Sequence, residues 1–244
     1  MNGPNTYYRR HLPHFQPEGE TYHVVFRLAG SVPANTIEEI RYRRDQEEKQ
    51  IANTRNETEK IKIFGKHGWK YFEQIEKALD ENTRGPFWLR NARIAGIVQE
   101  AIRYRDRKEY DLLADSIMPN HVHMIFRLLA ESLQGRNSVP PERECWSTSL
   151  VDHKTGSSRR RDSSTHTVTN ILENLKWYTA LKANRLLERK GSFWQHESYD
   201  HVIRDDKELE RTIEYVLMNP VKAGLCKDWR DWKWSYVKEG FVGD

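Results

Sequence analysis

The chain has 244 residues, a formal net charge of +4 and 31% charged residues, and its mean hydropathy of −0.89 is that of a very polar protein. No apolar run approaches the roughly 20 residues that cross a bilayer, and the N-terminal residues lack the apolar stretch of a secretory signal. Two cysteines, Cys145 and Cys226, are too few for a disulfide framework or a four-thiolate zinc site. The composition therefore predicts a cytoplasmic protein without a membrane partner.

The first half of the chain predicts one strand and several helices. Residues 21–28 are rich in aromatic and β-branched side chains and predict a strand. Residues 36–61 carry few large apolar side chains, which indicates an exposed helix or a surface excursion. Apolar residues at near-helical spacing within 69–79 predict a short amphipathic helix, and residues 87–105 predict a stronger one.

The second half begins with a predicted strand pair, residues 110–118 and 122–129, joined through Pro119 and Asn120. Residues 130–167 lose any apolar pattern and indicate a flexible insertion. A long helix is then predicted for residues 168–189 and a strand for residues 199–203.

The last predicted helix covers residues 207–218. Asp205 or Asp206 can cap its start, and Pro220 is expected to end it. Helices interleaved with strands and one strand pair predict an α+β fold with an antiparallel sheet. We expect a single domain over residues 1–244, with a core of about 8–234 and insertions at 36–61 and 130–167.

A histidine pair stands on the second strand of the predicted pair. Side chains alternate along a strand, so His121 and His123 point to one face while Val122, Met124 and Phe126 take the other. Two imidazoles at this spacing can share a cation. A partly exposed strand carrying two polar residues explains the same pattern, and a His-x-His motif alone does not decide between them.

A tyrosine and an asparagine share one face of the last predicted helix. Tyr215 and Asn219 are four residues apart, and Arg211 lies one turn earlier, all away from the apolar stripe of Ile213 and Leu217. Tyr178, in the preceding helix, is the competing tyrosine. No amide stands four residues after it, so Tyr215 is the preferred candidate.

The motifs MPNHVHMIF at residues 118–126 and YVLMNPVKAGL at 215–225, after the opening RRHLPHF and YHVVFRL, resemble those of the REP-associated tyrosine transposases. These are single-tyrosine relatives of the HUH endonucleases, and the resemblance spans about residues 8–234. It implies a ferredoxin-like antiparallel sheet that displays the histidine pair, with helices packed on one side. It also favours a monomer over a dimer.

The resemblance implies a role for each matching residue. His121, His123 and Asn219 match the metal ligands, with Mg²⁺ or Mn²⁺ as the cofactor, and Tyr215 matches the nucleophile. The implied reaction cleaves and rejoins single-stranded DNA through a 5′-phosphotyrosine intermediate. No nucleotide is needed, because the covalent link retains the energy of the broken bond.

Single-stranded DNA, with a hairpin of the REP type, is the implied partner. Residues 84–108 hold seven basic and two acidic residues, a density that suits a phosphate backbone. The residues expected to contact DNA are Arg84, Arg90, Arg93, Arg103, Arg105, Arg107 and Lys108 in this segment, and Arg211 and Lys222 near the tyrosine.

Two other interpretations of the residues remain open at this stage. A domesticated relative would bind hairpin DNA without cleaving it, although it would not need to retain all four site residues. An unrelated metallohydrolase would combine the histidine pair with carboxylates such as Asp115 or Asp200. It would not need Tyr215 and Asn219 to share a helical face.

Overall fold

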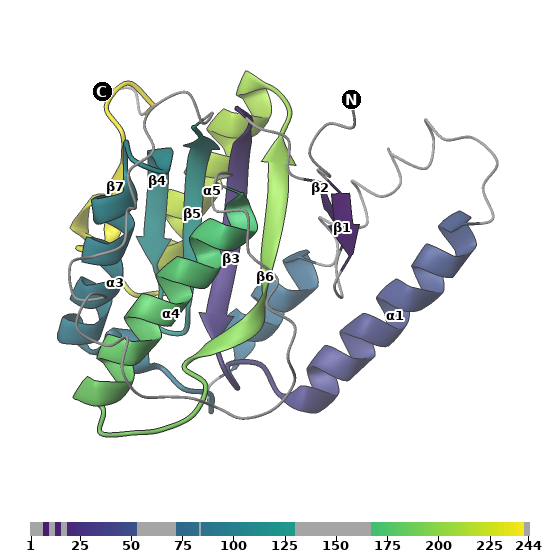
Figure 1. Cartoon of the computed structure of the whole chain (residues 1–244), viewed down its shortest axis with the longest axis horizontal. Helices are drawn as coiled ribbons and strands as arrows, with labels where there is room; N and C mark the ends of the chain where they lie inside the picture. Colours follow the sequence, from purple (N-terminus) through teal and green to yellow (C-terminus); the bar gives the residue numbers. More distant parts are fainter. Residues whose placement is uncertain are drawn as a thin grey trace, which may run out of the picture.

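The computed structural model describes residues 7–9, 13–15, 19–52, 72–82, 84–129 and 167–241 of the chain. At its centre lies a five-stranded antiparallel sheet in the order β6-β3-β5-β4-β7 (Figure 1). A separate two-stranded ribbon pairs β1 with β2 near the N-terminus. The strands are β1 (Tyr7–Arg9), β2 (Pro13–Phe15), β3 (Thr21–Leu28), β4 (Tyr110–Ile117), β5 (His121–Leu128), β6 (Trp194–Ile203) and β7 (Ser235–Val237).

The connections between these strands confirm the α+β fold class. The chain runs β3, α3 (Ala92–Arg105), β4, β5, α4 (Val168–Leu186) and β6. If β3, β4, β5 and β6 are numbered 1 to 4 in chain order, they lie side by side in the order 4-1-3-2. This is the ferredoxin-like arrangement of two interlocked βαβ units. No helix among the described residues is long and apolar enough to cross a membrane.

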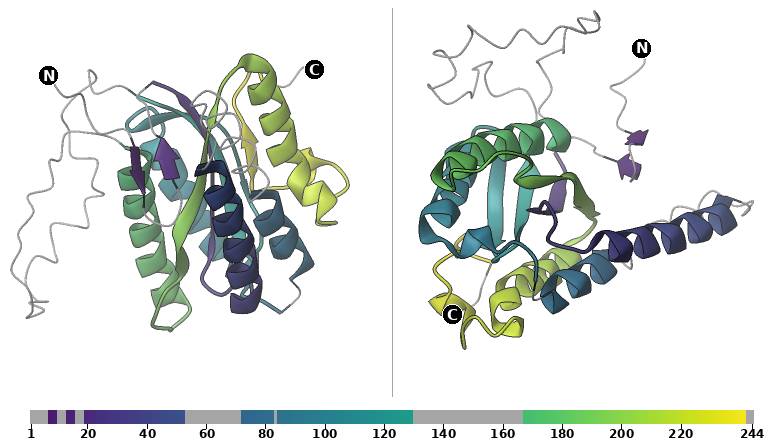
Figure 2. Two further views of the ribbon diagram at one scale, coloured as in Figure 1. Left: turned by 90° about the vertical axis from the view of Figure 1, so that its right-hand side faces the viewer. Right: turned by 90° about the horizontal axis from the view of Figure 1, so that it is seen from below.

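Helices cover both faces of the sheet, which corrects the expectation of helices on one side. Helices α3 and α4 lie on one face, and α5 (Asp206–Lys222) lies on the other together with the helical residues 72–81 (Figure 2). The second layer is needed because Leu113, Ala114 and Ile125 form an apolar cluster that α5 buries.

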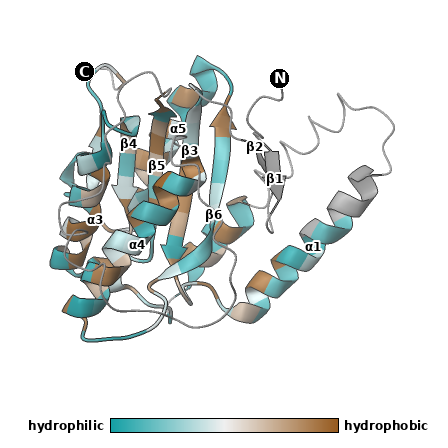
Figure 3. Cartoon of the chain, viewed as in Figure 1, coloured by the Kyte–Doolittle hydropathy of each residue, from teal (hydrophilic) through white to brown (hydrophobic). Residues whose placement is uncertain are grey.

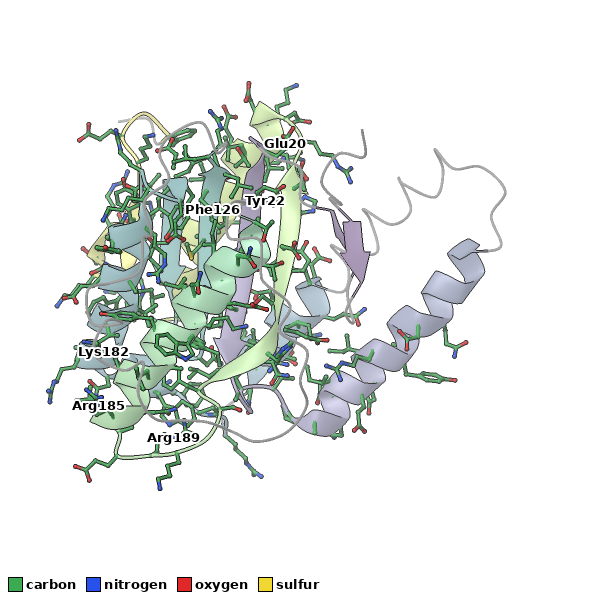
Figure 4. All side chains as sticks on the ribbon, viewed as in Figure 1. Glu20, Tyr22, Phe126, Lys182, Arg185 and Arg189 are labelled. Carbon is green, nitrogen blue, oxygen red and sulfur yellow. The ribbon has the colours of Figure 1, made fainter. Side chains whose placement is uncertain are left out.

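The main core lies between the sheet and the pair α3 and α4. Alternate residues of the two central strands, such as Val24 and Phe26 on β3 and Val122 and Phe126 on β5, are fully buried there. Tyr22 and Phe126 lie side by side with ring centroids 6.2 Å apart (Figure 4). Hydrophobic residues accordingly concentrate on the central strands (Figure 3).

Helix α1 (Ala34–Ala52) begins the segment that was expected to be an exposed helix or a surface excursion. Its first two turns are packed, because Ile37 and Ile40 are buried, and Ile37 lies against Val32 and Leu79. Its outer part projects from the body of the molecule (Figures 1 and 2). Residues 53–61, and residues 130–166 of the insertion predicted at 130–167, lie outside the described residues.

Two element boundaries differ from the sequence prediction for local reasons. The predicted helix at 87–105 is a 3-10 turn over Trp88–Arg90 followed by α3, because the Asn91 side chain accepts a hydrogen bond from Arg93 N–H and caps a new helix. Strand β6 begins at Trp194 instead of residue 199. It is an edge strand, so its residues do not need to be apolar.

Pro220 does not end α5, contrary to the prediction. It lies in the last turn, where proline removes only one hydrogen bond, and the Ala223 N–H still donates to the Asn219 carbonyl. The helix ends at Lys222, and two residues later the chain turns away at Gly224, whose φ of 68° is readily accessible only to glycine. The predicted cap is confirmed, because the Asp205 side chain accepts a hydrogen bond from Glu208 N–H.

Candidate active site

Strand β5 places the two histidines on one face of the sheet, as the alternation of its residues predicts. His121 and His123 are 1% and 0% exposed and lie beneath α5 and the helical residues 72–81, whereas Val122 and Met124 point into the main core. The two Nε2 atoms are 2.9 Å apart. Two imidazole nitrogens this close need a proton or a cation between their lone pairs.

Helix α5 brings Asn219 and Tyr215 to the histidines. Leu209, Ile213 and Val216 anchor the helix on the sheet. The Asn219 amide nitrogen then lies 3.3 Å from His123 Nε2, and the side chain is buried. A half-turn of this amide would present its oxygen, the ligand atom, at the same place.

The Tyr215 ring lies beside the histidines and is half-buried. Its centroid is 6.0 Å from that of His123, and Lys222 Nζ lies 4.7 Å from it on one side. The phenol donates a hydrogen bond of 3.1 Å to Glu76 Oε2. Burial and the Glu76 carboxylate raise the pKa of Tyr215 well above its ordinary value, so the phenol is held protonated.

Glu76 completes the cluster and was missed from the sequence. Its Oε2 lies 3.1 Å from His123 Nε2 and 3.9 Å from His121 Nε2, and its Oε1 is buried without a hydrogen-bond partner among the described residues. Burial alone would raise the pKa of Glu76, but the facing imidazoles of His123 and His121 outweigh it and lower that pKa to about 2. The carboxylate is therefore ionised.

The sequence did carry a signal for Glu76. It stands four residues after Phe72 and three before Leu79, inside the apolar stripe of the predicted amphipathic helix. A carboxylate on the buried stripe of a helix needs a partner, because an isolated buried charge is costly. That reasoning would have directed attention to the histidine face.

The donors of this cluster fit a divalent cation. One ligand atom each from Glu76, His121 and His123 lies within 4.8 Å of the others. Burial lowers the pKa of His121 to about 4, so its imidazole is neutral and able to ligate. Imidazole nitrogens with carboxylate and amide oxygens form a mixed donor set that admits Mn²⁺ or Mg²⁺.

The other candidates for this chemistry lie on the opposite face of the sheet. Asp115 pairs with Met124 and Asp200 with Val24 in the strand register, so both point away from the histidines. Tyr178 packs against the main core on α4. A metallohydrolase site built from His123 and these carboxylates is therefore excluded by the geometry.

The predicted DNA-contacting residues fall at two ends of the sheet. Arg84, Arg90 and Arg93 are exposed where β5 begins, next to Pro119, whose carbonyl accepts a hydrogen bond from Leu89 N–H. Arg211 and Lys222 are exposed on α5. Of the remaining residues, Arg103 and Arg105 lie in the last turn of α3, and Arg107 and Lys108 follow it, at the other end of the sheet where β4 begins.

The prediction that Arg105 contacts DNA is wrong. Its side chain is 2% exposed, Nη1 donates to the Ala101 carbonyl at 2.7 Å, and Nε lies 3.7 Å from Glu109 Oε1. A side chain enclosed in this way cannot reach a phosphate. Arg103 is also engaged within the fold, because it lies 3.2 Å from Asp115 Oδ2 and over the Tyr236 ring.

Comparison with known proteins adds two relatives and one solved structure. No family model matches the chain. A protein of Haemophilus influenzae named as a REP-associated tyrosine transposase is 25% identical over 126 residues, which cover 52% of this chain and 58% of the relative. The REP-associated tyrosine transposase of Escherichia coli is 36% identical over 44 residues, which cover 18% of this chain and 27% of that protein.

The matched segments thus span less than two thirds of either relative. The structure of a REP-associated tyrosine transposase bound to a REP hairpin aligns with a TM-score of 0.46 and 14% identity, over 93% of this chain and 80% of that chain. The curated relatives confirm the resemblance to the REP-associated tyrosine transposases that the histidine and tyrosine motifs indicate.

Proposed function

We propose that this relative of the REP-associated tyrosine transposases is a metal-dependent transposase that cleaves and rejoins single-stranded DNA. One observation carries the proposal. The Tyr215 hydroxyl lies 3.1 Å from the Glu76 oxygen that itself lies 3.1 Å from His123 Nε2, so a nucleophile and a metal-ligand cluster share one buried site. Five side chains from β5, α5 and the helical residues 72–81 converge there, which a structural tyrosine would not require.

The residues that would hold the cation are His121, His123, Asn219 and Glu76. Bound there, Mg²⁺ or Mn²⁺ would supply Lewis-acid polarisation of the scissile phosphate and offset the charge that develops on it. The ligands are buried and come from three elements packed against one another, so the site is formed before DNA arrives. Such preorganisation avoids a reorganisation cost during the reaction.

Tyr215 is the residue positioned to attack the phosphorus. Its phenol loses the proton as the oxygen forms the new bond to phosphorus, and the bond to the 3′-oxygen breaks as that oxygen takes up a proton, which leaves a 5′-phosphotyrosine link and a free 3′-hydroxyl. Glu76 orients the phenol by accepting its hydrogen bond, and Lys222 places a positive charge over the ring. A hydroxyl of a DNA strand can then displace the tyrosine and rejoin the backbone.

The DNA would approach the end of the sheet where β5 begins. Exposed basic residues gather there from separate elements, including Arg84, Arg90 and Arg93, and their charges suit a phosphate backbone. Arg211 and Lys222 flank Tyr215 on α5. A hairpin with a single-stranded foot is the substrate class that the resemblance of the histidine and tyrosine motifs implies, and one chain supplies every residue of the cluster, so a monomer is sufficient.

The decisive experiment is detection of the covalent intermediate. The protein is incubated with end-labelled hairpin-bearing single-stranded DNA and Mn²⁺ or Mg²⁺, denatured, and examined for a labelled protein–DNA band. We expect the band with the wild-type chain and with the matched control Tyr178→Phe, and no band with Tyr215→Phe. A band that survives Tyr215→Phe contradicts the assignment, and hairpin binding without any band supports a DNA-binding protein that does not cleave.

A further inference from the structure

Each histidine of the pair is held from behind at its second ring nitrogen. Asn120 Oδ1 lies 2.7 Å from His121 Nδ1, and Asn120 Nδ2 donates to the Leu79 carbonyl at 3.1 Å. Asn120 therefore links the His121 ring to the helical residues that carry Glu76. A third histidine, His23, is in the corresponding position behind His123, with its Nε2 3.2 Å from His123 Nδ1.

His23 is fixed by its own surroundings. It lies on β3 and is fully buried, and its ring is nearly parallel to that of His123, with an interplanar angle of 11° and centroids 5.5 Å apart. The Phe72 ring lies edge-on to it, with centroids 5.3 Å apart. The centroids of the Tyr199 and Tyr215 rings lie 6.2 and 6.4 Å from that of His23. A ring enclosed in this way can hold its neighbour in one orientation.

The atom that His23 contacts decides its role. Its Nε2 is directed at the Nδ1 of His123, on the opposite side of that ring from the Nε2 that faces Glu76 and His121. An imidazole hydrogen-bonded at Nδ1 keeps its Nε2 aimed at the cation, and such outer partners set ring orientation in metal sites. His23 therefore acts through His123 and does not itself ligate through the engaged nitrogen.

We propose that His23 is a positioning residue of the metal site, holding His123 as Asn120 holds His121. The proposal rests on the proposed function only in requiring that the cluster bind a divalent cation. A purely structural role for His23 predicts something different. An aromatic ring of similar size would then serve equally well, since its neighbours are Phe72, Tyr199 and Tyr215.

The test measures Mn²⁺ affinity of the full chain without DNA, by electron paramagnetic resonance of the free ion or by calorimetry. His23→Phe keeps an aromatic ring and removes the hydrogen bond, and we expect it to raise the Mn²⁺ dissociation constant about 10–100-fold. His23→Gln places an amide near the position of Nε2 and should recover most of the affinity. His201→Phe is the matched control, because His201 pairs with His23 across β3 and β6 but bonds to Glu208.

Two results would overturn the role of His23 alone: His23→Phe binding Mn²⁺ as tightly as the wild type, or His23→Gln binding it as weakly as His23→Phe. Circular dichroism of each variant reports whether the fold is intact, and the glutamine variant keeps the comparison meaningful if the phenylalanine variant is unstable. A wild-type chain without measurable Mn²⁺ binding overturns the metal site itself and this proposal with it.

Discussion

Glu76 and Asp115 are both buried carboxylates beside β5, but they lie on opposite faces of the sheet and their pKa values are shifted in opposite directions. Burial raises the pKa of Asp115 to about 7, because the one facing cation, Arg103, only partly compensates. Burial also acts on Glu76, yet the imidazoles of His123 and His121 outweigh it and lower its pKa to about 2. The pKa of the same chemical group is therefore raised on the apolar face and lowered on the histidine face.

The two faces of the sheet therefore have different roles: one stabilises the fold, and the other carries the candidate site. The face toward α3 and α4 is filled by apolar side chains such as Phe126 and Met124, with Asp115 as a polar exception. The opposite face buries Glu76 and three imidazoles, His23, His121 and His123, whose desolvation opposes folding. A buried polar cluster of that kind is expected where ligand binding offsets its cost.

The largest effect is expected from truncation on the apolar face. Phe126 is fully buried between Tyr22 and Tyr110, so Phe126→Ala should lower the free energy of unfolding by about 3–5 kcal/mol, the usual cost of an unfilled aromatic site. Urea unfolding of the variant and the wild type measures the difference. Phe126→Leu is the control, and its free energy of unfolding should fall clearly less than that of Phe126→Ala. Equal decreases in the two variants would mean that this ring does not stabilise the fold through packing.

The next effect belongs to the histidine face. Glu76→Gln keeps the size of the side chain but removes the charge, and we expect Mn²⁺ affinity to fall at least about tenfold, since carboxylate ligands supply both charge and a donor atom. Asp115→Asn is the matched control, because its carboxylate lies on the other face. Titration with Mn²⁺ compares the two variants. An equal loss of Mn²⁺ affinity in both would contradict the assignment of the metal site to the histidine face.

Asp115 itself should leave a signature in the pH dependence of stability. The pKa of Asp115 is about 7 in the folded chain and near 3.9 in the unfolded chain. The folded state therefore holds the proton more tightly, and the stabilisation that this gives is fully present below pH 4 and is lost as the pH rises toward 7. The loss is at most about 1.4 kcal/mol per pH unit for one proton. Unfolding free energies at pH 5 and pH 6 should therefore fall less steeply for Asp115→Asn than for the wild type, and parallel slopes would contradict the raised pKa.

The sequence was most informative where one face of an element is apolar. Strand β3 was predicted with its observed ends, because aromatic and β-branched residues run along this interior strand, which is buried over its whole length. The edge strand β6 was predicted five residues too short, because exposed edge positions carry no apolar pattern. Pro220 was misassigned, because the cost of a proline depends on which turn of a helix it occupies.

The site could be predicted only as far as its members lie close in sequence. His121 and His123 share a strand face, and Tyr215 and Asn219 share a helix face, so local geometry related the members of each pair. Glu76 comes from a third element, 45 residues before His121, and only the folded chain brings it to them. Arg105 shows the converse, because Arg107 and Lys108 beside it in the sequence are exposed while its own side chain turns into the core.

The smallest expected effect distinguishes the two ends of the sheet. The 14 residues of α3 extend about 21 Å, so Arg93 at its start and Lys108 beyond its end cannot serve the same stretch of DNA near the histidines. If DNA binds where β5 begins, Arg93→Ala should remove one phosphate contact, weaken hairpin binding a few-fold and reduce the slope of log affinity against log salt by roughly one. Lys108→Ala should change neither quantity. Fluorescence anisotropy with a labelled hairpin over a salt series measures both, and a reduced slope for Lys108→Ala alone would place the DNA at the opposite end, away from Tyr215.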